Sequence, residues 1–226
     1  MDPPDLHRSS QLVGGTKDPN EDQIVGLKPD FIFLNSEENE KKSFQKLKSL
    51  LPNSKFVISQ PASVEEAILE VENIEALLKE YIQKPYSPIL WQKQNSLLEK
   101  QEFHIVANAL YFIWNDPVMV AGESTFIQDT MKYLGFNNAC TQKRYPVMQD
   151  NWLANTKVLL FSSEPFAFRN RHIQTFLSQH SWFKGNVYKI DGKLMSWHGT
   201  TLIEFFEEAN SFWNKIDCNI LESFNG

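Results

Sequence analysis

The stretch KPDFIFLNSEEN, residues 28–39, joins an apolar run to a polar, acidic end. Phe31 to Leu34 form the apolar run, and the segment 35–39 that follows contains Glu37 and Glu38. A short, continuous apolar run bounded by polar residues is typical of a strand in a parallel sheet that is covered on both faces. The sequence therefore predicts a fully buried strand whose carboxyl end displays acidic side chains.

A second stretch, LANTKVLLFSSEPF at residues 153–166, follows the same pattern. When the two are aligned, Ser163 takes the place of Ser36 and Glu164 that of Glu37. Any two strand–helix units share such an outline, so one match is weak evidence for an internal repeat. The Ser-Glu pair at the same distance past each strand is less generic, and it predicts two equivalent lobes with one carboxylate at the tip of each.

These carboxylates have two compatible interpretations. Residues just beyond the carboxyl ends of parallel strands face the ligand crevice or its rim. Two acids related by a pseudo-twofold axis can be recognised by a twofold-symmetric partner, each lobe meeting one subunit. The alternative is that Glu37 and Glu164 lie near helix N-termini and complement the helix dipoles.

The rest of the chain alternates between predicted strands and helices, which indicates an α/β protein with mainly parallel sheets. Expected strands cover residues 31–34, 55–59, 104–114, 157–161 and 186–190. Expected helices cover residues 19–28, 41–51, 63–81, 91–101, 124–134, 169–179 and 200–215. We divide the chain into an N-terminal lobe (1–62), a connecting helical segment (63–102) and a C-terminal lobe (103–226).

Several residues mark where these helices begin and end. Asp18 is expected to cap the first helix, with Pro19 at its first position. Ser63 and Glu66 have capping-box spacing at the start of the connecting segment. Gly135 follows the helix at 124–134 in a typical C-terminal cap position.

Composition describes an ordinary folded chain. Its 226 residues are 42% hydrophobic and include 17 Phe, 6 Trp and 6 Tyr, which is enough apolar surface to exclude disorder. The net charge of −6 disfavours binding to nucleic acid through its phosphates. The two cysteines, Cys140 and Cys218, form no CxxC motif and are interpreted as unrelated thiols.

No apolar run is long enough to cross a membrane, and the N-terminal residues lack the features of a signal peptide. We therefore expect a cytoplasmic protein, or an exported one whose export segment lies upstream of this chain.

Five segments in the same order resemble a known family. They are VGGTKDPNEDQIVGLKPDFIFLNSEEN (13–39), YFIWNDPVMVAGESTFIQDTMKYLGFNNA (111–139), RYPVM (144–148), LLFSSEPFAFRNRHI (159–173) and DGKLMSWHG (191–199). Together they are similar to the cobalamin-binding, helical-backbone metal receptors, the substrate-binding proteins of ABC transporters for cobalamin and iron chelates. The resemblance covers roughly residues 11–215.

The resemblance implies a fold similar to class III periplasmic binding proteins, with two α/β lobes joined by one long, rigid helix. A metal chelate such as a corrinoid, heme or iron-siderophore would be held between the lobes. Each lobe would offer a surface glutamate to an arginine pocket on a dimeric permease. By position these docking acids are Glu164 in the second lobe and Glu37 or Glu38 in the first, and the sequence does not choose between the last two.

The resemblance also implies a set of ligand-facing residues, for which core packing is the alternative. Large flat ligands suit aromatic walls, which bury much area at little entropic cost. The residues in matching positions are Trp114, Asn115, Pro117, Tyr145, Trp197 and His198.

Two features depart from the family. A strand and helix that would precede Pro3 have no counterpart, so we expect a first lobe that is truncated at its N-terminus and whose sheet has an exposed edge. Pro85 and Pro88 are expected to interrupt the connecting helix or to delay its start.

We expect no catalytic residues, no metal site and no cofactor. The five histidines show no zinc-binding spacing, and there is no nucleophile elbow. His198, beside Trp197, could approach a bound metal centre, although a hydrogen-bonding loop residue is the more frequent case. We therefore expect a monomeric, non-enzymatic binding protein. The alternatives are a cytoplasmic corrinoid- or metal-handling protein without a transporter, and an α/β enzyme with an unrecognised site.

Overall fold

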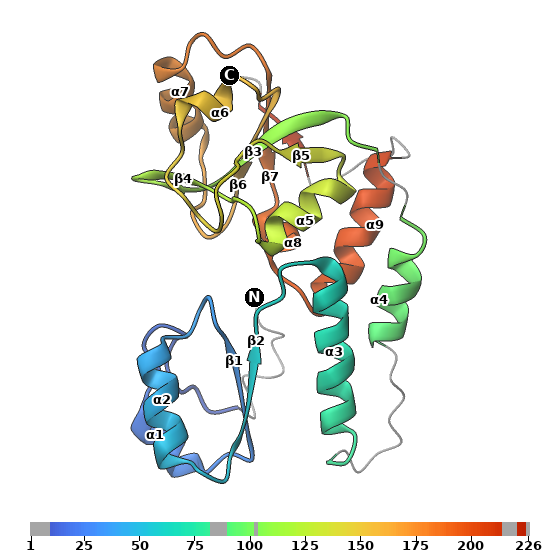
Figure 1. The fold of residues 1–226 in the computed structure, drawn as a ribbon. Helices are drawn as coiled ribbons and strands as arrows, with labels where there is room; N and C mark the ends of the chain where they lie inside the picture. The colour runs from blue at the N-terminus through green and yellow to red at the C-terminus, as the bar shows by residue number, and fades with distance from the viewer. Residues whose placement is uncertain (1–9, 82–89, 102–103, 214–220, 225–226) are drawn as a thin grey trace. The chain divides into compact units, whose positions relative to one another are not determined.

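The computed structural model describes residues 10–81, 90–101, 104–213 and 221–224 (Figure 1). The chain divides into two compact units, Met1–Gln60 and Pro61–Gly226. The sequence-based boundary after residue 62 lies two residues from this division. The connecting segment, residues 63–102, belongs to the second unit.

The first unit has the order helix–strand–helix–strand. The elements are α1 (Glu21–Leu27), β1 (Phe31–Asn35), α2 (Lys41–Leu50) and β2 (Lys55–Ser59). Strands β1 and β2 pair in parallel, with Phe31 opposite Lys55. A small core forms where Ile32 of β1 meets Leu47 and Leu51 at the C-terminal half of α2.

Two sequence-based expectations for this unit are wrong. The strand at 31–34 is not fully buried, because only Ile32 is buried and Phe33 is 46% exposed. Within the described residues, β1 pairs with β2 alone, so its outer side lacks the neighbour that a central strand would have. Asp18 does not cap α1; Asn20 does, by accepting a hydrogen bond from the backbone N–H of Gln23 at 3.1 Å.

The connecting segment contains two helices, α3 (Val64–Leu78) and α4 (Leu90–Leu98). Ser63 caps α3 as predicted and accepts from the N–H of Glu66. The Glu66 carboxylate accepts from the N–H of Ala62, one residue earlier than a capping box requires. Helix α4 begins after Pro85 and Pro88, which lie outside the described residues.

The second unit is built on one sheet of strand order β4-β3-β6-β7-β8, with β5 paired to β3. Strands β3, β5, β6 and β7 run parallel to one another, whereas β4 pairs antiparallel with β3 and β8 antiparallel with β7. The strands are β3 (Ala107–Asn115), β4 (Val118–Val120), β5 (Phe136–Asn138), β6 (Val158–Ser162), β7 (Asn186–Ile190) and β8 (Leu221–Ser223). The helices are α5 (Phe126–Tyr133), α6 (Asp150–Leu153), α7 (Asn170–Gln179), α8 (Gly192–Ser196) and α9 (Thr201–Trp213).

Strand β6 is buried at every position and divides the unit into two cores. Val158 and Leu160 face a core that includes α5, α8 and α9. Leu159 and Phe161 face a second core against α7, where the rings of Phe161 and Phe112 stack with centroids 4.4 Å apart. The alternation confirms that the VLLF run is a strand covered on both faces.

The predicted strands and helices of this unit are confirmed within a few residues at their ends. Gly135 has φ 75° and follows α5 as a C-terminal cap, as expected. Sequence analysis missed the shorter elements β4, β5, α6, α8 and β8.

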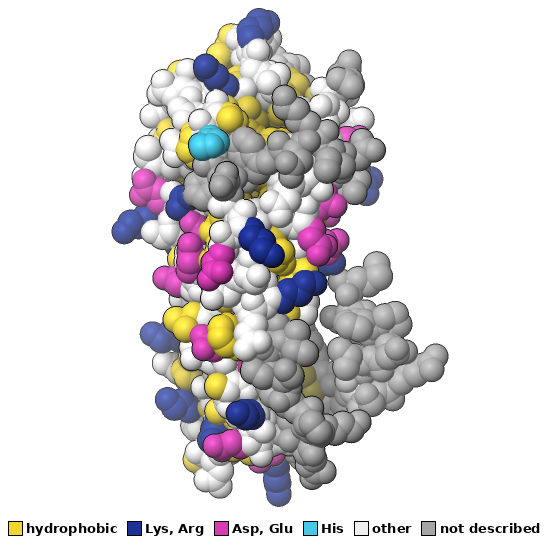
Figure 2. All heavy atoms as spheres, turned by 90° about the vertical axis from the view of Figure 1, so that its right-hand side faces the viewer, with side chains coloured by type: hydrophobic (Ala, Val, Ile, Leu, Met, Phe, Trp, Pro, Cys, Tyr) yellow, Lys and Arg dark blue, Asp and Glu magenta, His cyan; other side chains and the backbone are white. Residues whose placement is uncertain are grey.

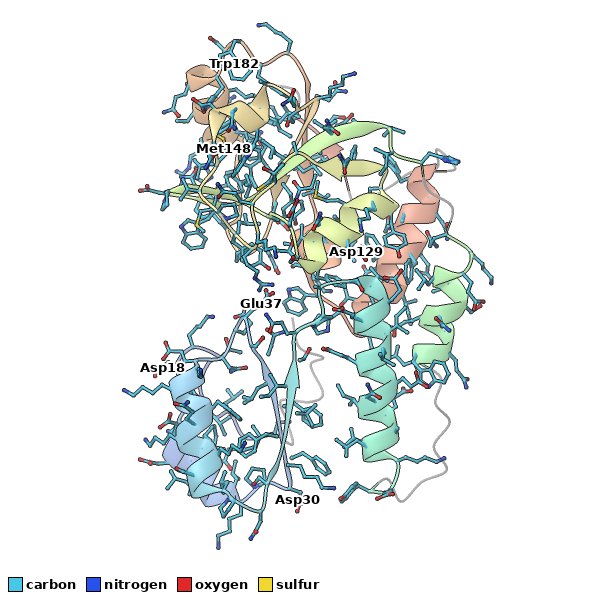
Figure 3. The ribbon with its side chains drawn as sticks, in the orientation of Figure 1. Asp18, Asp30, Glu37, Asp129, Met148 and Trp182 are labelled. Carbon is cyan, nitrogen blue, oxygen red and sulfur yellow. The ribbon has the colours of Figure 1, made fainter. Side chains whose placement is uncertain are left out.

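Asp129 of α5 (Figure 3) binds the start of α3 and so holds the connecting segment against the rest of the second unit. Its Oδ2 atom accepts a buried hydrogen bond of 2.8 Å from the backbone N–H of Val64, and its Oδ1 pairs with Lys132 at 2.7 Å. Tyr133, one turn further along α5, donates to Glu65 at 3.5 Å, and burial raises the pKa of its phenol. The first turn of α3 is therefore held to α5 by a carboxylate that satisfies one of its free N–H groups.

We expect Asp129→Ala to lower the free energy of unfolding by about 1–3 kcal/mol, because it leaves the Val64 N–H buried without an acceptor. Urea denaturation followed by circular dichroism measures the change. Asp150→Ala is the matched control, since that carboxylate is mostly exposed and should change stability by less than about 0.5 kcal/mol. Equal effects of the two substitutions would contradict the anchoring role of Asp129.

Candidate functional site

The candidate site of the second unit is the edge of its sheet where β3, β6 and β7 end. Because these three strands are parallel, their carboxyl ends meet at the same edge. Strand β3 leads into the turn at residues 115–117, β6 into the turn that bears Glu164, and β7 into α8 and then Trp197. The structure thus brings the turns that contain several of the predicted residues to one edge.

The Glu164 turn is held by the last residue of β6. Ser162 is fully buried; its Oγ accepts the backbone N–H of Glu164 at 3.1 Å and donates to the Glu164 carbonyl. The hydroxyl of Tyr111, also fully buried, lies 2.9 Å from the same Oγ. Since the single Ser162 proton is already donated, Tyr111 is the donor to Ser162. Burial raises the pKa of Tyr111, which keeps this donor protonated.

Helix α8 packs directly against this turn. Gly192 donates its N–H to Ser163 Oγ at 3.0 Å. A Cβ atom at Gly192 would collide with Ser162 Oγ and would lie 2.6 Å from the Glu164 nitrogen. Only glycine allows this close approach, so the start of α8 and the Glu164 turn are packed as one piece.

The acidic turn of the first unit has a related geometry. Asn35, the last residue of β1, accepts the backbone N–H of Glu37 through Oδ1 at 2.9 Å. The side chain of Asn39 accepts from the N–H of Asn35 at 2.8 Å. Lys17 donates to the Glu37 carbonyl at 2.6 Å, and Thr16 donates to Glu38 at 3.3 Å. Glu37 therefore lies in a pinned turn at the end of β1, where Figure 3 labels it.

Trp114, Asn115 and Pro117 lie in the β3–β4 hairpin. Trp114 is 41% exposed, and its Nε1 donates to the carbonyl of Asp116 at 3.0 Å. Its ring packs edge-on against Phe166 at 5.7 Å, so it contacts the segment that follows Glu164. Pro117 is exposed and follows a cis peptide bond.

Trp197 and His198 follow α8. Asp191 caps α8 by accepting from the N–H groups of Lys193 and Leu194, and Trp197 is its C-cap residue, 43% exposed. The His198 ring packs edge-on against Phe126, the first residue of α5, at 5.8 Å. The predicted loop is therefore anchored at Trp197 to α8, which sequence analysis missed, and at His198 to α5, which it predicted.

A residue of the connecting segment, which sequence analysis did not identify, binds the loop that contains Trp197 and His198. Gln94 of α4 is fully buried and donates through Nε2 to the carbonyl of Gly199. A polar residue on a short helix gives no signal of such a role in the sequence. The bond ties α4 to the loop that contains Trp197 and His198.

Tyr145 is half-buried in the loop after β5 and packs against the core shared with α5. The guanidinium of Arg144 lies over its ring, 5.4 Å from the centroid, and also donates to the carbonyl of Ser124 at 2.9 Å. His198 thus contacts the first residue of α5, and Arg144, which lies over the Tyr145 ring, bonds to Ser124 just before that helix. Trp114 lies by contrast against the Glu164 segment.

A cavity of about 350 Å³ lies within the first unit rather than at this sheet edge. Its walls come from β1, α1, α2 and the segment at residues 11–19, and include Phe31, Phe44 and Leu47. None of the predicted ligand-facing residues lines it.

The described residues hold no group of three or more His, Cys, Asp and Glu side chains that could bind a metal ion.

Burial raises the pKa of the free Cys140 thiol, which disfavours the reactive thiolate. Desolvation and the neighbouring Arg171 lower the pKa of His172. Cys218 lies outside the described residues, so its state stays a prediction. On the face drawn in Figure 2, acidic and basic side chains are interspersed.

Comparison with known proteins identifies the fold. No protein-family model and no curated protein matches the chain. Among solved structures, the periplasmic vitamin B12-binding protein BtuF of Vibrio cholerae is similar with a TM-score of 0.69 and 16% identity, over 94% of this chain and 84% of that one. A periplasmic heme-binding protein from Pseudomonas aeruginosa gives 0.68 and 14%, over 99% and 87%. The heme-binding protein BhuT, in complex with two hemes, gives 0.66 and 14%, over 94% and 85%.

The chain therefore has the fold of the class III periplasmic binding proteins, as the sequence resemblance implied. The particular structures that it matches are of proteins that bind vitamin B12 or heme. Across the described residues, no helix is both long and apolar enough to span a membrane.

We expect Cys140 to react slowly with N-ethylmaleimide in the folded protein, because it is buried and its thiol stays protonated to a higher pH than a free cysteine. The rate, measured by mass spectrometry in a Cys218→Ser background at pH 7 and 8, should rise sharply in urea. Labelling as fast as that of glutathione without urea would contradict the buried position.

Proposed function

We propose that this chain is a non-enzymatic substrate-binding protein for a metal chelate, either a cobalamin-like corrinoid or heme, which it delivers to an ABC importer. The observation that carries the proposal is the likeness of nearly the whole chain to periplasmic proteins that bind vitamin B12 or heme. The first probes are accordingly corrinoids and hemin, and a ferric siderophore is the alternative ligand of the same class.

The aromatic side chains at the carboxyl edge of the second unit support a large, flat ligand. Trp114 and Trp197 are both about two-fifths exposed, and Tyr145 is half-buried. The Trp114 ring is held by its Nε1 bond to the Asp116 carbonyl, and Trp197 is held at its backbone N–H by the Lys193 carbonyl. Partly exposed aromatic rings offer area for stacking, and aromatic side chains lose little conformational entropy on binding. We assign Trp197 as the principal contact, with Trp114, Asn115, Pro117, Tyr145 and His198 contributing.

The acidic turns support docking to a permease. Glu37 and Glu164 each follow the last residue of a parallel strand, and each has its backbone N–H bound by that residue. Charge-assisted hydrogen bonds to arginine would then form without reorganising the turn. We place the protein outside the cytoplasm, where its structural neighbours are named as periplasmic, and we propose that it works as a monomer against a permease dimer.

We expect tryptophan fluorescence to be quenched saturably by cyanocobalamin and cobinamide, or by hemin, at micromolar or lower concentration. Trp197→Ala should weaken the binding at least ten-fold, since it removes a large aromatic contact. Trp182→Ala is the matched control, because Trp182 is similarly exposed, at 51%, but follows α7 near the opposite end of β7 (Figure 3).

Equal losses in the two variants would contradict the assignment of the ligand to the carboxyl edge. Binding of neither corrinoids, hemin nor ferric siderophore would contradict the proposed ligand class.

We expect Glu164→Gln to weaken docking by about ten-fold or more, because the amide cannot form the charge-assisted hydrogen bond that the carboxylate makes with arginine. The measurement is competition between unlabelled variants and fluorescently labelled wild-type protein for membrane vesicles from the source organism. Glu37→Gln and Glu38→Gln are compared in the same assay, and only one of them should match Glu164→Gln. Glu222→Gln, at an exposed ion pair with Lys189, is the control and should compete like the wild type.

A further inference from the structure

We propose that Asn35 and Ser162 are a matched pair of positioning residues, which hold Glu37 and Glu164 in the orientation that a permease recognises. The inference rests on the proposed docking function and deepens it. It also selects Glu37 over Glu38 as the docking acid of the first unit.

The two residues occupy equivalent places. Each is the last residue of a strand, β1 or β6, and each stands two residues before its glutamate. Asn35 Oδ1 accepts from the N–H of Glu37 at 2.9 Å, and Ser162 Oγ accepts from the N–H of Glu164 at 3.1 Å. No corresponding bond to Glu38 arises from Asn35, whose backbone carbonyl, not its side chain, accepts the Glu38 N–H at 3.2 Å.

The backbone around the two residues repeats as well. The N–H of Ser36 donates to the carbonyl of Ser59, the last residue of β2, at 3.0 Å. The N–H of Ser163 donates to the carbonyl of Ile190, the last residue of β7, also at 3.0 Å. In both units the chain therefore leaves its strand by bonding to the neighbouring parallel strand, and the side chain of the last residue then binds the glutamate N–H. The likeness between the two units extends from sequence pattern to individual hydrogen bonds.

Ser162 is more than a local turn residue. Its hydroxyl is fully buried and makes three hydrogen bonds, one given to the Glu164 carbonyl and two accepted from the Glu164 N–H and the Tyr111 hydroxyl. One proton and two lone pairs are thereby all used. Ser162 thus fixes both backbone polar groups of Glu164, and Tyr111 fixes Ser162 from within the core.

The test is a set of single and double variants in the vesicle competition assay. Ser162→Ala and Asn35→Ala should each weaken docking about five-fold, the size of one neutral hydrogen bond. Tyr111→Phe, which removes only the hydroxyl behind Ser162, should weaken docking in the same direction. Asn35→Asp keeps the acceptor oxygen and should restore docking. Ser178→Ala, an exposed hydroxyl on α7, should have no effect.

The decisive readout is additivity, because a purely structural role would not depend on the glutamate. In a Glu164→Gln background, Ser162→Ala should cause no further loss, and Asn35→Ala should cause none in a Glu37→Gln background. Affinity for hemin and cyanocobalamin should stay unchanged, and hydrogen exchange at the amides of Glu37 and Glu164 should accelerate in the Ala variants.

Losses that add in full to those of the glutamate variants would overturn the positioning role while leaving the docking role intact. Wild-type levels of competition by Glu37→Gln and Glu164→Gln would overturn the docking role, and the positioning role with it. Faster amide exchange without any change in docking would likewise overturn the proposal, since the turn would then be held for stability alone.

Discussion

The complete burial of β6 is the constraint from which the second unit follows. Every residue from Val158 to Ser162 is buried, so both faces of the strand need apolar cover and every polar group on it needs a partner. Helices α5, α8 and α9 cover one face, and α7 covers the other. Ser162 is the one polar side chain of the strand, and its hydroxyl is satisfied by Tyr111 and by the backbone of Glu164. The backbone position of Glu164 is in this way set by two buried side chains, Ser162 and Tyr111.

The second unit was predictable because its long strands are both apolar and central. The run VLLF predicts a doubly covered strand, and helices on both faces of the sheet supply that cover. The run FIFL in β1 has the same pattern, yet Phe33 stays half-exposed because the small core of the first unit takes Ile32 and Leu34 from this strand and not Phe33. The pattern of apolar residues indicates which side chains of a strand could be buried. Whether they are buried depends on elements that cover the strand and that lie elsewhere in the chain.

The short elements and the polar contacts account for the rest of what the sequence did not reveal. Helix α8 has five residues and no helical period, although Asp191 before it is a typical N-cap and could have indicated its start. At α1 the predicted cap was Asp18, whereas Asn20, two residues further along, caps the helix. Contacts over long sequence separations, such as Gln94 to Gly199 or Asp129 to Val64, leave no local pattern at all. The resemblance identified the segments of the candidate site, but the bonds that hold those segments appeared only in three dimensions.

The two acidic turns share their innermost hydrogen bond but differ in what lies behind it. The Glu37 turn is braced by Lys17 and Asn39, which are partly exposed and belong to the first unit alone. The Glu164 turn is braced by Gly192 at the start of α8, and the other end of α8 is Trp197, the residue assigned to the ligand. Because Gly192 leaves no free space against the turn, the start of α8 and the backbone of Glu164 are packed as one piece. The Glu164 turn is thus packed against a short helix whose other end carries the partly exposed ring of Trp197.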